Sequence, residues 1–203
     1  MTAQRSKKTG PLPLGTTPSQ TIGPFHRIMV PWEGGGTLTS RDEPAAIIIR
    51  GQIYDGQNTP VDDCVLEIWQ ANVHGRYAHP DDTREVPLVE GFEGFGRVIT
   101  DKNGRFELLT VKPGCVPGPN GSVQAPHVSL SLFARGLLKR LATRMYFSDE
   151  RAVNEKDPVL QSIANSTRRR TLVATRQENP SKPPVYEFVI RLQGDKETVF
   201  FDI

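Results

Sequence analysis

The chain has 203 residues, of which 36% are hydrophobic and 24% are charged, so it is long enough for one soluble globular domain with a real core. Its formal net charge of +2 does not imply nucleic acid or an anionic membrane as a partner, and no apolar stretch approaches the ~18 residues that a transmembrane helix needs. The basic start lacks the apolar segment of a secretory signal, and two cysteines are too few for a disulfide framework, so we expect a cytoplasmic protein with reduced thiols.

The N-terminal part of the chain is predicted to lie outside the folded body. Residues 1–16 are rich in Lys, Arg, Thr, Gly and Pro and are expected to be disordered. The next segment, TPSQTIGPF at 17–25, contains two prolines and a glycine that exclude a helix, so it is expected to be extended and rigid. An arm of this kind often packs on a partner. We therefore expect residues 17–45, including a flexible EGGGT loop, to contact a partner subunit.

Residues 46–203 are predicted to form the main domain, built from short strands joined by turns. Apolar runs mark the strands AAIIIRGQIYD, CVLEIWQA, GRVIT, RFELLTV, HVSLSLFA, TRMYF, TLVAT, VYEFVIRL and TVFFDI. Asn103-Gly104 is a strong signal for a hairpin between two of them. One short helix is expected after Asp157, a natural N-cap, with Pro158 in its first position. The pattern predicts an all-β fold, an antiparallel β-sandwich.

Two stretches between the strands attract attention. Residues 72–95 form a long excursion with HPDDTREVP and EGFEGFG, and long loops on a rigid sandwich are where binding functions tend to lie. Tyr77 in this loop is expected to be a packing residue, because partners for phenolate ligation of a metal are not evident. The basic cluster TRRRT, at 167–171, is expected to be a solvated surface, with a salt-bridged interface as the alternative.

His127 is the first candidate for chemistry. It begins the strand HVSLSLFA, and Ser129 faces the same way, where a second histidine would complete a His-x-His pair suited to a metal ion. An iron or zinc site needs three or four ligands from His, Cys, Asp, Glu or Tyr, and His74 and His79 are too isolated to supply them. A buried structural histidine is therefore preferred to a metal ligand.

Arg135 is the second candidate and closes the same strand in an apolar context, next to Gly136. It is either a solvated charge at the edge of the sheet or a bidentate clamp on a carboxylate. Guanidinium geometry suits the second task better than an ammonium group does. The residues alone leave both interpretations open.

Several long blocks of the sequence resemble one known family. They are TPSQTIGPF, DGQNTPVDDCVLEIWQANVHGRY, GFGRVITDKNGRFELLTVKPG, QAPHVSLSLFARG, TRMYFSDE and the terminal RLQGDKETVFFDI. From about Thr17 to the C-terminus, the chain is similar to the α subunits of the protocatechuate 3,4-dioxygenases, which are intradiol ring-cleaving enzymes. The resemblance implies a β-sandwich core and a homologous β subunit as partner, in a higher αβ oligomer.

The resemblance also implies that Fe(III) is held by two tyrosines and two histidines of the β subunit, with no metal on this chain. His127 matches the first histidine of the family's His-x-His strand, whereas Ser129 replaces the second. The tyrosine after the KPG turn falls on Val116, and the tyrosine of the long loop falls near Arg84. One imidazole cannot hold Fe(III) without the phenolates. His127 is thus expected to be the remnant of a metal site, kept for packing or hydrogen bonding.

The resemblance places the active site at the α–β interface, where the α chain forms part of the substrate pocket. On this chain the matching residues are Thr21, Gly23, Pro24, Phe25 and Arg135. The family usually has a tyrosine where this chain has Phe25, so any contact of that hydroxyl is missing. The implied reaction opens the ring of protocatechuate between its two hydroxyl-bearing carbons, with O₂, to give 3-carboxy-cis,cis-muconate. No catalytic residue is expected on this chain alone.

Two other functions are compatible with the sequence. A stand-alone β-sandwich binding module without catalysis would share the scaffold and its turns. An iron-dependent dioxygenase acting as a homo-oligomer would need a complete ligand set. The N-terminal arm argues against the first, because a monomer has no reason to keep it.

Overall fold

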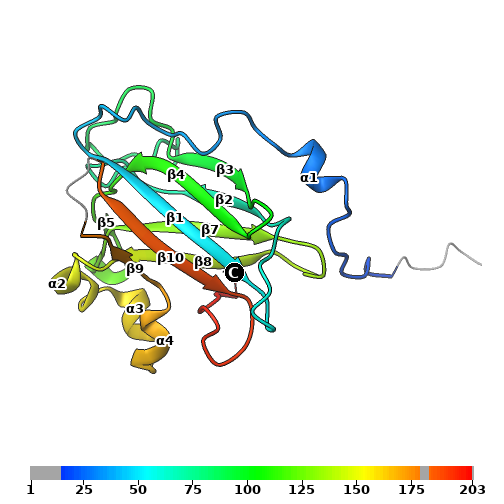
Figure 1. Ribbon diagram of the computed structural model, residues 1–203. Helices are drawn as coiled ribbons and strands as arrows, with labels where there is room; N and C mark the ends of the chain where they lie inside the picture. Colours follow the sequence, from blue (N-terminus) through cyan, green and yellow to red (C-terminus); the bar gives the residue numbers. More distant parts are fainter. Residues whose placement is uncertain (1–14, 179–182, 203) are drawn as a thin grey trace, which may run out of the picture.

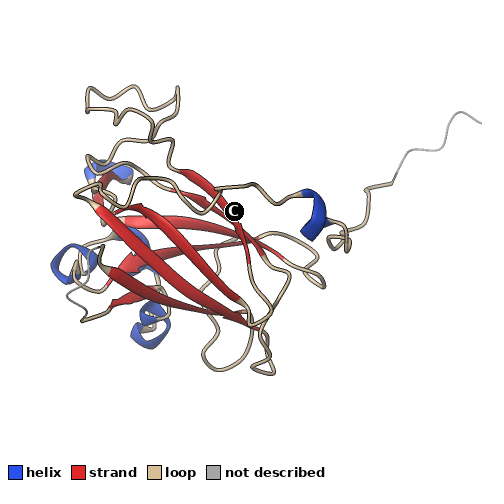
Figure 2. Ribbon diagram, turned by 45° about the horizontal axis from the view of Figure 1, so that its top comes forward, coloured by secondary structure: helices blue, strands red, loops and turns tan. Residues whose placement is uncertain are grey.

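Most of the predicted strands form, and the short helices α2, α3 and α4 gather at one side of them, whereas α1 lies apart at the other side (Figures 1 and 2). The computed structural model describes residues 15–178 and 183–202. The strands are Ala46–Tyr54 (β1), Val65–Trp69 (β2), Phe95–Ile99 (β3), Arg105–Val111 (β4), Val116–Pro117 (β5), Val123–Gln124 (β6), His127–Phe133 (β7), Leu141–Phe147 (β8), Val173–Arg176 (β9) and Val185–Arg191 (β10). The α-helices are His26–Met29 (α1), Arg151–Asn154 (α2), Pro158–Ser162 (α3) and Ser166–Arg170 (α4), and Pro119–Gly121 forms a 3₁₀ turn.

Eight strands join into one mixed sheet in the order β3-β2-β7-β8-β9-β10-β1-β4, while β5 and β6 pair separately. The prediction of a wholly antiparallel sandwich is wrong, because β1 pairs with β10 and β8 pairs with β9 in parallel. The short strand β9 is the reason that the two halves are one sheet, since it pairs with both β8 and β10. Parallel partners lie far apart in sequence, so local turn signals do not reveal them.

The sheet curls until its edge strands β3 and β4 approach each other, and residues 35–38 bridge the two. The amide of Arg97 on β3 donates to the Gly35 carbonyl at 2.9 Å, and the amide of Leu109 on β4 donates to the Gly36 carbonyl at 2.8 Å. A Cβ on Gly35 would collide with the Arg97 carbonyl oxygen, so this close approach of two backbones requires glycine. The segment expected to be a flexible loop is therefore a hydrogen-bonded link that nearly closes the sheet.

The main hydrophobic core lies inside the curled sheet. Strand β7 shows how the sequence builds it, because Val128, Leu130 and Leu132 are buried there. Ser129 and Ser131, at the alternate positions, are half-exposed on the outer face. His127 is also buried, although it shares the outer face with Ser129, because loops cover that end of the strand. This alternation places the candidate residues of β7 outside the core.

The helices only partly match expectation. Helix α3 begins at Pro158, and the Asp157 side chain accepts hydrogen bonds from the amides of Val159 and Leu160, which confirms the predicted helix and its cap. Three further short helices were not predicted, and the basic cluster 167–171 lies mostly within one of them, α4. The terminal TVFFDI run was predicted as a strand, but its described part makes only an isolated bridge between Phe201 and Ala142.

The turn at Asn103-Gly104 forms, but the strands that flank it do not pair with each other. Gly104 has a positive φ of 67°, whereas Asn103 is not among the residues with positive φ. A type I′ hairpin turn needs a positive φ at both residues, so Asn103-Gly104 does not form that turn. Strand β3 pairs with β2 in one half of the sheet, and β4 pairs with β1 in the other.

The N-terminal arm stands beside the sheet rather than in it, as α1 shows at the right of Figure 1. No helix occurs in residues 17–25, as predicted, but α1 follows directly. The expectation of disorder for residues 1–16 falls, apart from the last two of them, outside the described residues. Within the described ranges, no helix has both the length and the apolar character to cross a membrane.

Candidate functional site at the two ends of strand β7

Strand β7 carries the two candidate residues at its opposite ends. His127 is its first residue, and Arg135 follows its last residue by two positions. At a rise of about 3.3 Å per residue, their Cα atoms are roughly 25 Å apart. In Figure 1, β5 lies near one end of the sheet and α1 lies beyond the other. The residues therefore belong to two different local sites on this chain.

The imidazole of His127 is buried and engaged with its surroundings. It is 4% exposed, its Nδ1 lies 2.7 Å from the Ala125 carbonyl oxygen, and its ring lies 5.7 Å from that of Tyr146. Burial, followed by the nearby charge of Arg144, lowers the pKa of His127 to about 4. The imidazole is therefore neutral at neutral pH, as a structural histidine would be.

A cavity of about 590 Å³ lies beside His127. It is bordered by Val116 and Arg84, so the structure brings together three of the four positions that the family resemblance assigned to a degenerate metal site. Ser129, the fourth, borders a neighbouring cavity of about 580 Å³. The two cavities share Trp69 and Arg144 as lining residues, so they adjoin along the outer face of the sheet.

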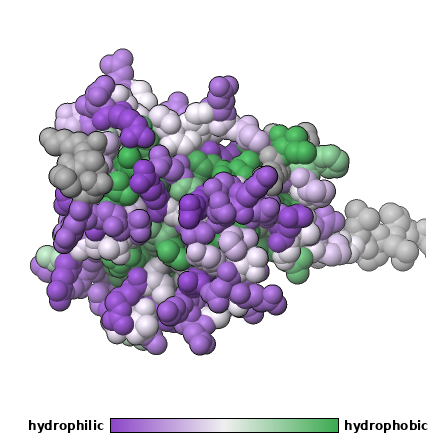
Figure 3. Space-filling view, viewed as in Figure 1, coloured by the Kyte–Doolittle hydropathy of each residue, from purple (hydrophilic) through white to green (hydrophobic). Residues whose placement is uncertain are grey.

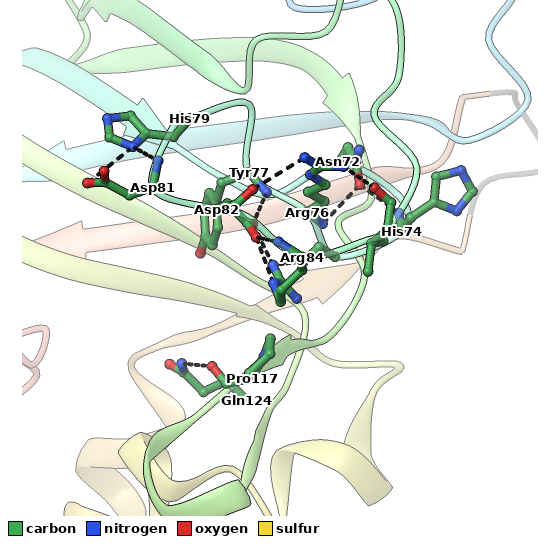
Figure 4. Close-up of polar contacts among 12 residues, drawn as sticks. Asn72, His74, Arg76, Tyr77, His79, Asp81, Asp82, Arg84, Pro117 and Gln124 are labelled. Atoms are coloured by element: carbon green, nitrogen blue, oxygen red, sulfur yellow. Dashed lines mark hydrogen bonds and ion pairs between the residues drawn. The ribbon is translucent and has the colours of Figure 1, made fainter.

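The long loop after β2 folds back over this cavity through a compact set of polar contacts (Figure 4). Arg84 donates to both carboxylate oxygens of Asp82, at 2.7 and 2.6 Å, and also to the Gly75 carbonyl. This pairing holds the pKa of Asp82 well below its usual range. The Tyr77 ring stacks on Trp69, the last residue of β2, at 5.7 Å and 13°, so Tyr77 is a packing residue that holds the loop against the end of the strand. The hydrogen bonds of the Arg84 guanidinium therefore hold the loop together.

The donor groups at the four positions do not fit a ferric ion. His127 offers a single imidazole, Val116 offers no donor, and Ser129 offers only a neutral hydroxyl. Arg84 adds a cation that is paired with Asp82. The resemblance implies a ferric ion held in part by anionic phenolate oxygens, and these four side chains provide no such donor. Across residues 15–178 and 183–202, no cluster of three or more His, Cys, Asp or Glu side chains suits a metal ion.

The other end of β7 meets the arm. Gly23, Pro24 and Arg135 line a cavity of about 150 Å³, and the Thr21 hydroxyl accepts a hydrogen bond from the Gly136 amide at 2.7 Å. The structure thus gathers four of the five predicted pocket residues. The fifth, Phe25, points outward with 69% of its surface exposed.

Arg135 is more constrained than the sequence suggested. Its Nε donates to the Asp63 carboxylate, and its Nη2 lies 3.9 Å from Asp62. The side chain nevertheless keeps 60% of its surface exposed. It is therefore an exposed charge whose guanidinium is oriented by Asp63, and its role as a clamp on a second carboxylate stays a prediction.

The arm also presents apolar side chains to solvent. Ile28 is 72% exposed, Trp32 is 47% exposed, and both lie on the same arm as Phe25. In Figure 3, apolar surface gathers at the upper right, where Figure 1 places α1. Exposed apolar clusters of this kind mark sites of protein–protein contact.

The sequence did not single out Arg144, a charged residue that lines the cavity beside His127. Arg144 on β8 is the register partner of Ser129, and its Nη1 donates to Gln124 Oε1 at 2.6 Å. The sequence shows Arg144 only as an ordinary charge in TRMYF. Its place opposite Ser129 depends on the register of β7 with β8, which the 135–140 turn does not specify.

Comparison with known proteins gives the family. A dioxygenase family model matches residues 24–194. The α chain of protocatechuate 3,4-dioxygenase from Pseudomonas putida is 43% identical over 201 residues, covering 93% of this chain and 97% of the relative. The chain belongs to the protocatechuate 3,4-dioxygenase α-chain family. Another member of the α-chain family, from Burkholderia cepacia, is 40% identical, covering 94% of this chain and 98% of the relative.

The α-chain family is homologous to β chains as well. The protocatechuate 3,4-dioxygenase β chain of Burkholderia cepacia is 35% identical over 158 residues, covering 75% of this chain and 66% of that protein. Among solved structures, 3-chlorocatechol 1,2-dioxygenase from Rhodococcus opacus 1CP superposes with a TM-score of 0.56 at 22% identity, over 76% of this chain and 62% of that one. The last likeness shows the shared fold.

Proposed function

We propose that this chain is the non-iron-binding α subunit of a protocatechuate 3,4-dioxygenase. It would form part of the substrate pocket at the interface with an iron-bearing β subunit. The complex would cleave protocatechuate between its two hydroxyl-bearing carbons, and both oxygen atoms of O₂ would enter the product, 3-carboxy-cis,cis-muconate. The ferric ion belongs to the partner in this proposal, because the donor groups beside His127 do not fit it.

The observation that carries the proposal is the separation of the two sites on β7. The arm and Arg135 lie roughly 25 Å from the cavity beside His127, by strand geometry, so they cannot line that cavity within the same chain. They lie instead next to exposed apolar residues suited to a protein contact. An arm placed in this way is available to complete a cavity on a neighbouring subunit.

Arg135 is the polar group of this chain that we assign to substrate positioning. Asp63 orients its guanidinium from one side through Nε, while the rest of the side chain stays open to the small cavity that Gly23 and Pro24 line. A planar guanidinium can donate two hydrogen bonds to the carboxylate of protocatechuate. The arm residues 17–45, packed against the partner, would exclude water and hold the ring in place.

The compartment and the oligomeric state of the enzyme are proposed from the same resemblance. We propose a cytoplasmic, higher αβ oligomer, with residues 46–203 as the dioxygenase-like domain of each α chain. Cys64 is a buried free thiol and Cys115 an exposed one, which supports a reducing compartment. A stand-alone binding module does not explain the exposed apolar arm.

The test is to express the chain together with an iron-bearing β homologue. We expect a coloured complex that turns over protocatechuate. In it, Arg135→Ala should reduce kcat/KM about 10- to 100-fold, chiefly through KM, since losing a charged hydrogen bond costs ~1.5–3 kcal/mol.

The matched control is Arg151→Ala. The Arg151 side chain is 87% exposed and, among the residues that the structure describes, pairs with Glu155 alone, so its loss should leave turnover within twofold of the parent. If Arg135→Ala behaves like the control, the carboxylate contact is wrong. Stoichiometric iron in the α chain purified alone would contradict the whole assignment.

A further inference from the structure

Two Asn-Gly pairs lie in turns to which the proposed function gives no role, Asn103-Gly104 and Asn120-Gly121. An asparagine before glycine can lose its side-chain amide by reacting with its own backbone, because glycine has no side chain to shield the next amide nitrogen. We propose that Asn120 is a site of this modification in the folded protein, whereas the fold protects Asn103. Ring cleavage plays no part in the reaction.

The reaction needs water and no other reactant, and no atom is oxidised or reduced. The amide nitrogen of Gly121 bonds to Cγ of Asn120, and the bond from Cγ to the side-chain nitrogen breaks, so ammonia leaves with the proton of the attacking amide. Water then opens the cyclic imide and returns a proton to the Gly121 nitrogen. Opening at Cγ gives aspartate. Opening at the main-chain carbonyl carbon gives isoaspartate, in which the chain runs through the former side chain.

The turn at Asn120 is open to this reaction. Pro119, Asn120 and Gly121 are all exposed, and the space where a Cβ on Gly121 would stand is empty. Asn120 has a φ of 55° and a ψ of 34°, in the left-handed region that a residue other than glycine occupies at some cost. Its carboxamide makes no hydrogen bond to any residue that the structure describes. Neither the side chain nor the backbone of Asn120 is therefore fixed by a strong preference.

The tip of this hairpin, residues 118–122, is held by bonds of its own in the described part of the chain. Ser122 donates to the Pro119 carbonyl through its amide at 3.1 Å and through its hydroxyl at 2.7 Å. The Gly118 amide donates to the Ser122 carbonyl at 2.8 Å. In a 3₁₀ turn an amide bonds three residues back, so the Gly121 amide can bond only to the Gly118 carbonyl. A rotation that brings the Gly121 nitrogen to Cγ of Asn120 thus breaks no bond outside the tip.

The turn at Asn103 is anchored to β1 instead. Gln52 Nε2 donates to the Asn103 carbonyl at 2.7 Å, and the Ile53 amide donates to the Gly104 carbonyl at 2.9 Å. Asp101 Oδ1 accepts from the Asn103 amide at 2.8 Å. Gly104 is buried, and the Ile53 carbonyl oxygen lies 2.7 Å from where its Cβ would stand. Reaction at Asn103 therefore requires a local opening that breaks bonds to another strand.

Modification of Asn120 would change the hairpin of β5 and β6. Pro117 and Gln124 of this hairpin, labelled in Figure 4, line the cavity beside His127, and Gln124 Oε1 accepts from Arg144. Both products replace a neutral amide by a carboxylate, and isoaspartate also adds a carbon to the main chain of the tip. Stored protein should therefore become a mixture of charge forms that ion exchange separates.

The experiment follows both asparagines in the full-length chain during incubation in mildly alkaline buffer, well below the temperature of unfolding. Proteolysis and mass spectrometry quantify each conversion, and chromatography separates the aspartate from the isoaspartate peptides. We expect Asn120 to react at least about tenfold faster than Asn103, because reaction at Asn103 must wait for local opening. In urea, where neither turn persists, the two rates should agree within about threefold, since both asparagines precede glycine.

Gln52→Ala tests the protection directly. It removes the donor to the Asn103 carbonyl, so Asn103 should react at least about threefold faster while Asn120 stays within about twofold of the parent. The matched control is Gln57→Ala, because Gln57 is exposed and its side chain makes no hydrogen bond to a described residue, so both rates should stay unchanged. Circular dichroism checks that the variants are folded.

Four results would each overturn the proposal: equal rates at the two asparagines of the folded chain, no reaction at Asn120, a difference that persists in urea, or an unchanged rate at Asn103 in folded Gln52→Ala. The comparison of the two asparagines in the parent chain decides the matter even if Gln52→Ala misfolds. Turnover of substrate is not measured, so failure here leaves the proposed function intact.

Discussion

His127 is the only buried histidine of the four, and its environment explains its neutral form. The Ala125 carbonyl oxygen lies 2.7 Å from Nδ1 of His127. The Tyr146 ring lies 5.7 Å from the imidazole ring. Arg144 lies close enough for its charge to disfavour protonation. A single side chain can therefore keep a defined packing role at a position where the neighbouring donors do not suit a metal ion.

The lowered pKa of His127 predicts a pH-dependent stability. The unfolded chain binds a proton near pH 6.5, whereas the folded chain binds it only near pH 4, so stability is complete above pH 6.5 and falls as the pH drops toward 4. Between pH 7.5 and 5.0 this group alone should reduce the free energy of unfolding by ~2 kcal/mol. Urea denaturation at both pH values measures it.

The matched variant for that measurement is His127→Phe, which keeps a ring in the pocket but cannot titrate. It should be less stable at pH 7.5, because the Ala125 carbonyl loses its partner. Its stability should nevertheless depend less on pH than that of the parent, by the same ~2 kcal/mol. An equal pH dependence in both proteins would show that His127 does not titrate as described.

The sequence could predict which face of a strand a residue occupies. It could not predict which residue from a distant part of the chain a side chain contacts. The alternation of HVSLSLFA correctly placed His127 and Ser129 on one face. Arg144 was overlooked, because its importance arises from register with Ser129 across two strands. Asp63 was overlooked as the partner of Arg135 for the same reason, since the two are distant in sequence.

Among the elements, α3 illustrates a short helix that depends on one residue. Asp157 is fully buried, caps the helix through the amides of Val159 and Leu160, and also accepts bonds from the Ala125 amide and the Tyr146 hydroxyl. It thereby ties α3 to the segment that leads into β7. Five residues of helix could not hold this place by propensity alone.

Asp157→Ala should therefore destabilise the protein by about 3–5 kcal/mol, since it removes a cap and leaves two further donors buried without a partner. Asn165→Ala is the matched control. Asn165 caps α4 in the same way, through the amides of Thr167 and Arg168, but it is exposed, and its side chain makes no further hydrogen bond within the described part of the chain. It should cost only about 1 kcal/mol. Equal losses in thermal or chemical denaturation would show that the extra bonds of Asp157 contribute little.

Elements were predictable where local chemistry decides them. The N-cap and the proline of α3 are read within a few residues, and the prediction is confirmed. The terminal TVFFDI run has the composition of a strand, but its backbone bonds go to separate elements: Thr198 to Arg191, Val199 to Thr171 and Phe201 to Ala142. No single neighbour offers it a ladder, and sequence patterns do not show that.

The two candidate sites of the molecule lie at opposite ends of one sheet. The mixed topology places the arm at one end and the loop-covered cavity at the other, and the core between them is shared. The parallel pairing of β1 with β10 joins distant parts of the chain, so the curl of the sheet, and with it the separation of the two sites, could not be derived from local patterns. The absence of helix in residues 17–25 was predictable, because the prolines there exclude it.

The arm's exposed apolar side chains predict a difference between the free chain and the complex. Ile28→Asp should change the stability of the free chain by less than about 0.5 kcal/mol, since the side chain is 72% exposed. In the complex, the same change would bury a charge without a partner, so association with the β homologue should weaken at least tenfold. Val189→Asp is the control, because Val189 is 49% exposed on β10, away from the arm, and should leave association within twofold. Sedimentation of the mixed chains measures the association of each variant with the β homologue. If the arm merely covers its own chain, the reverse result is expected: Ile28→Asp destabilises the free chain and leaves the association unchanged.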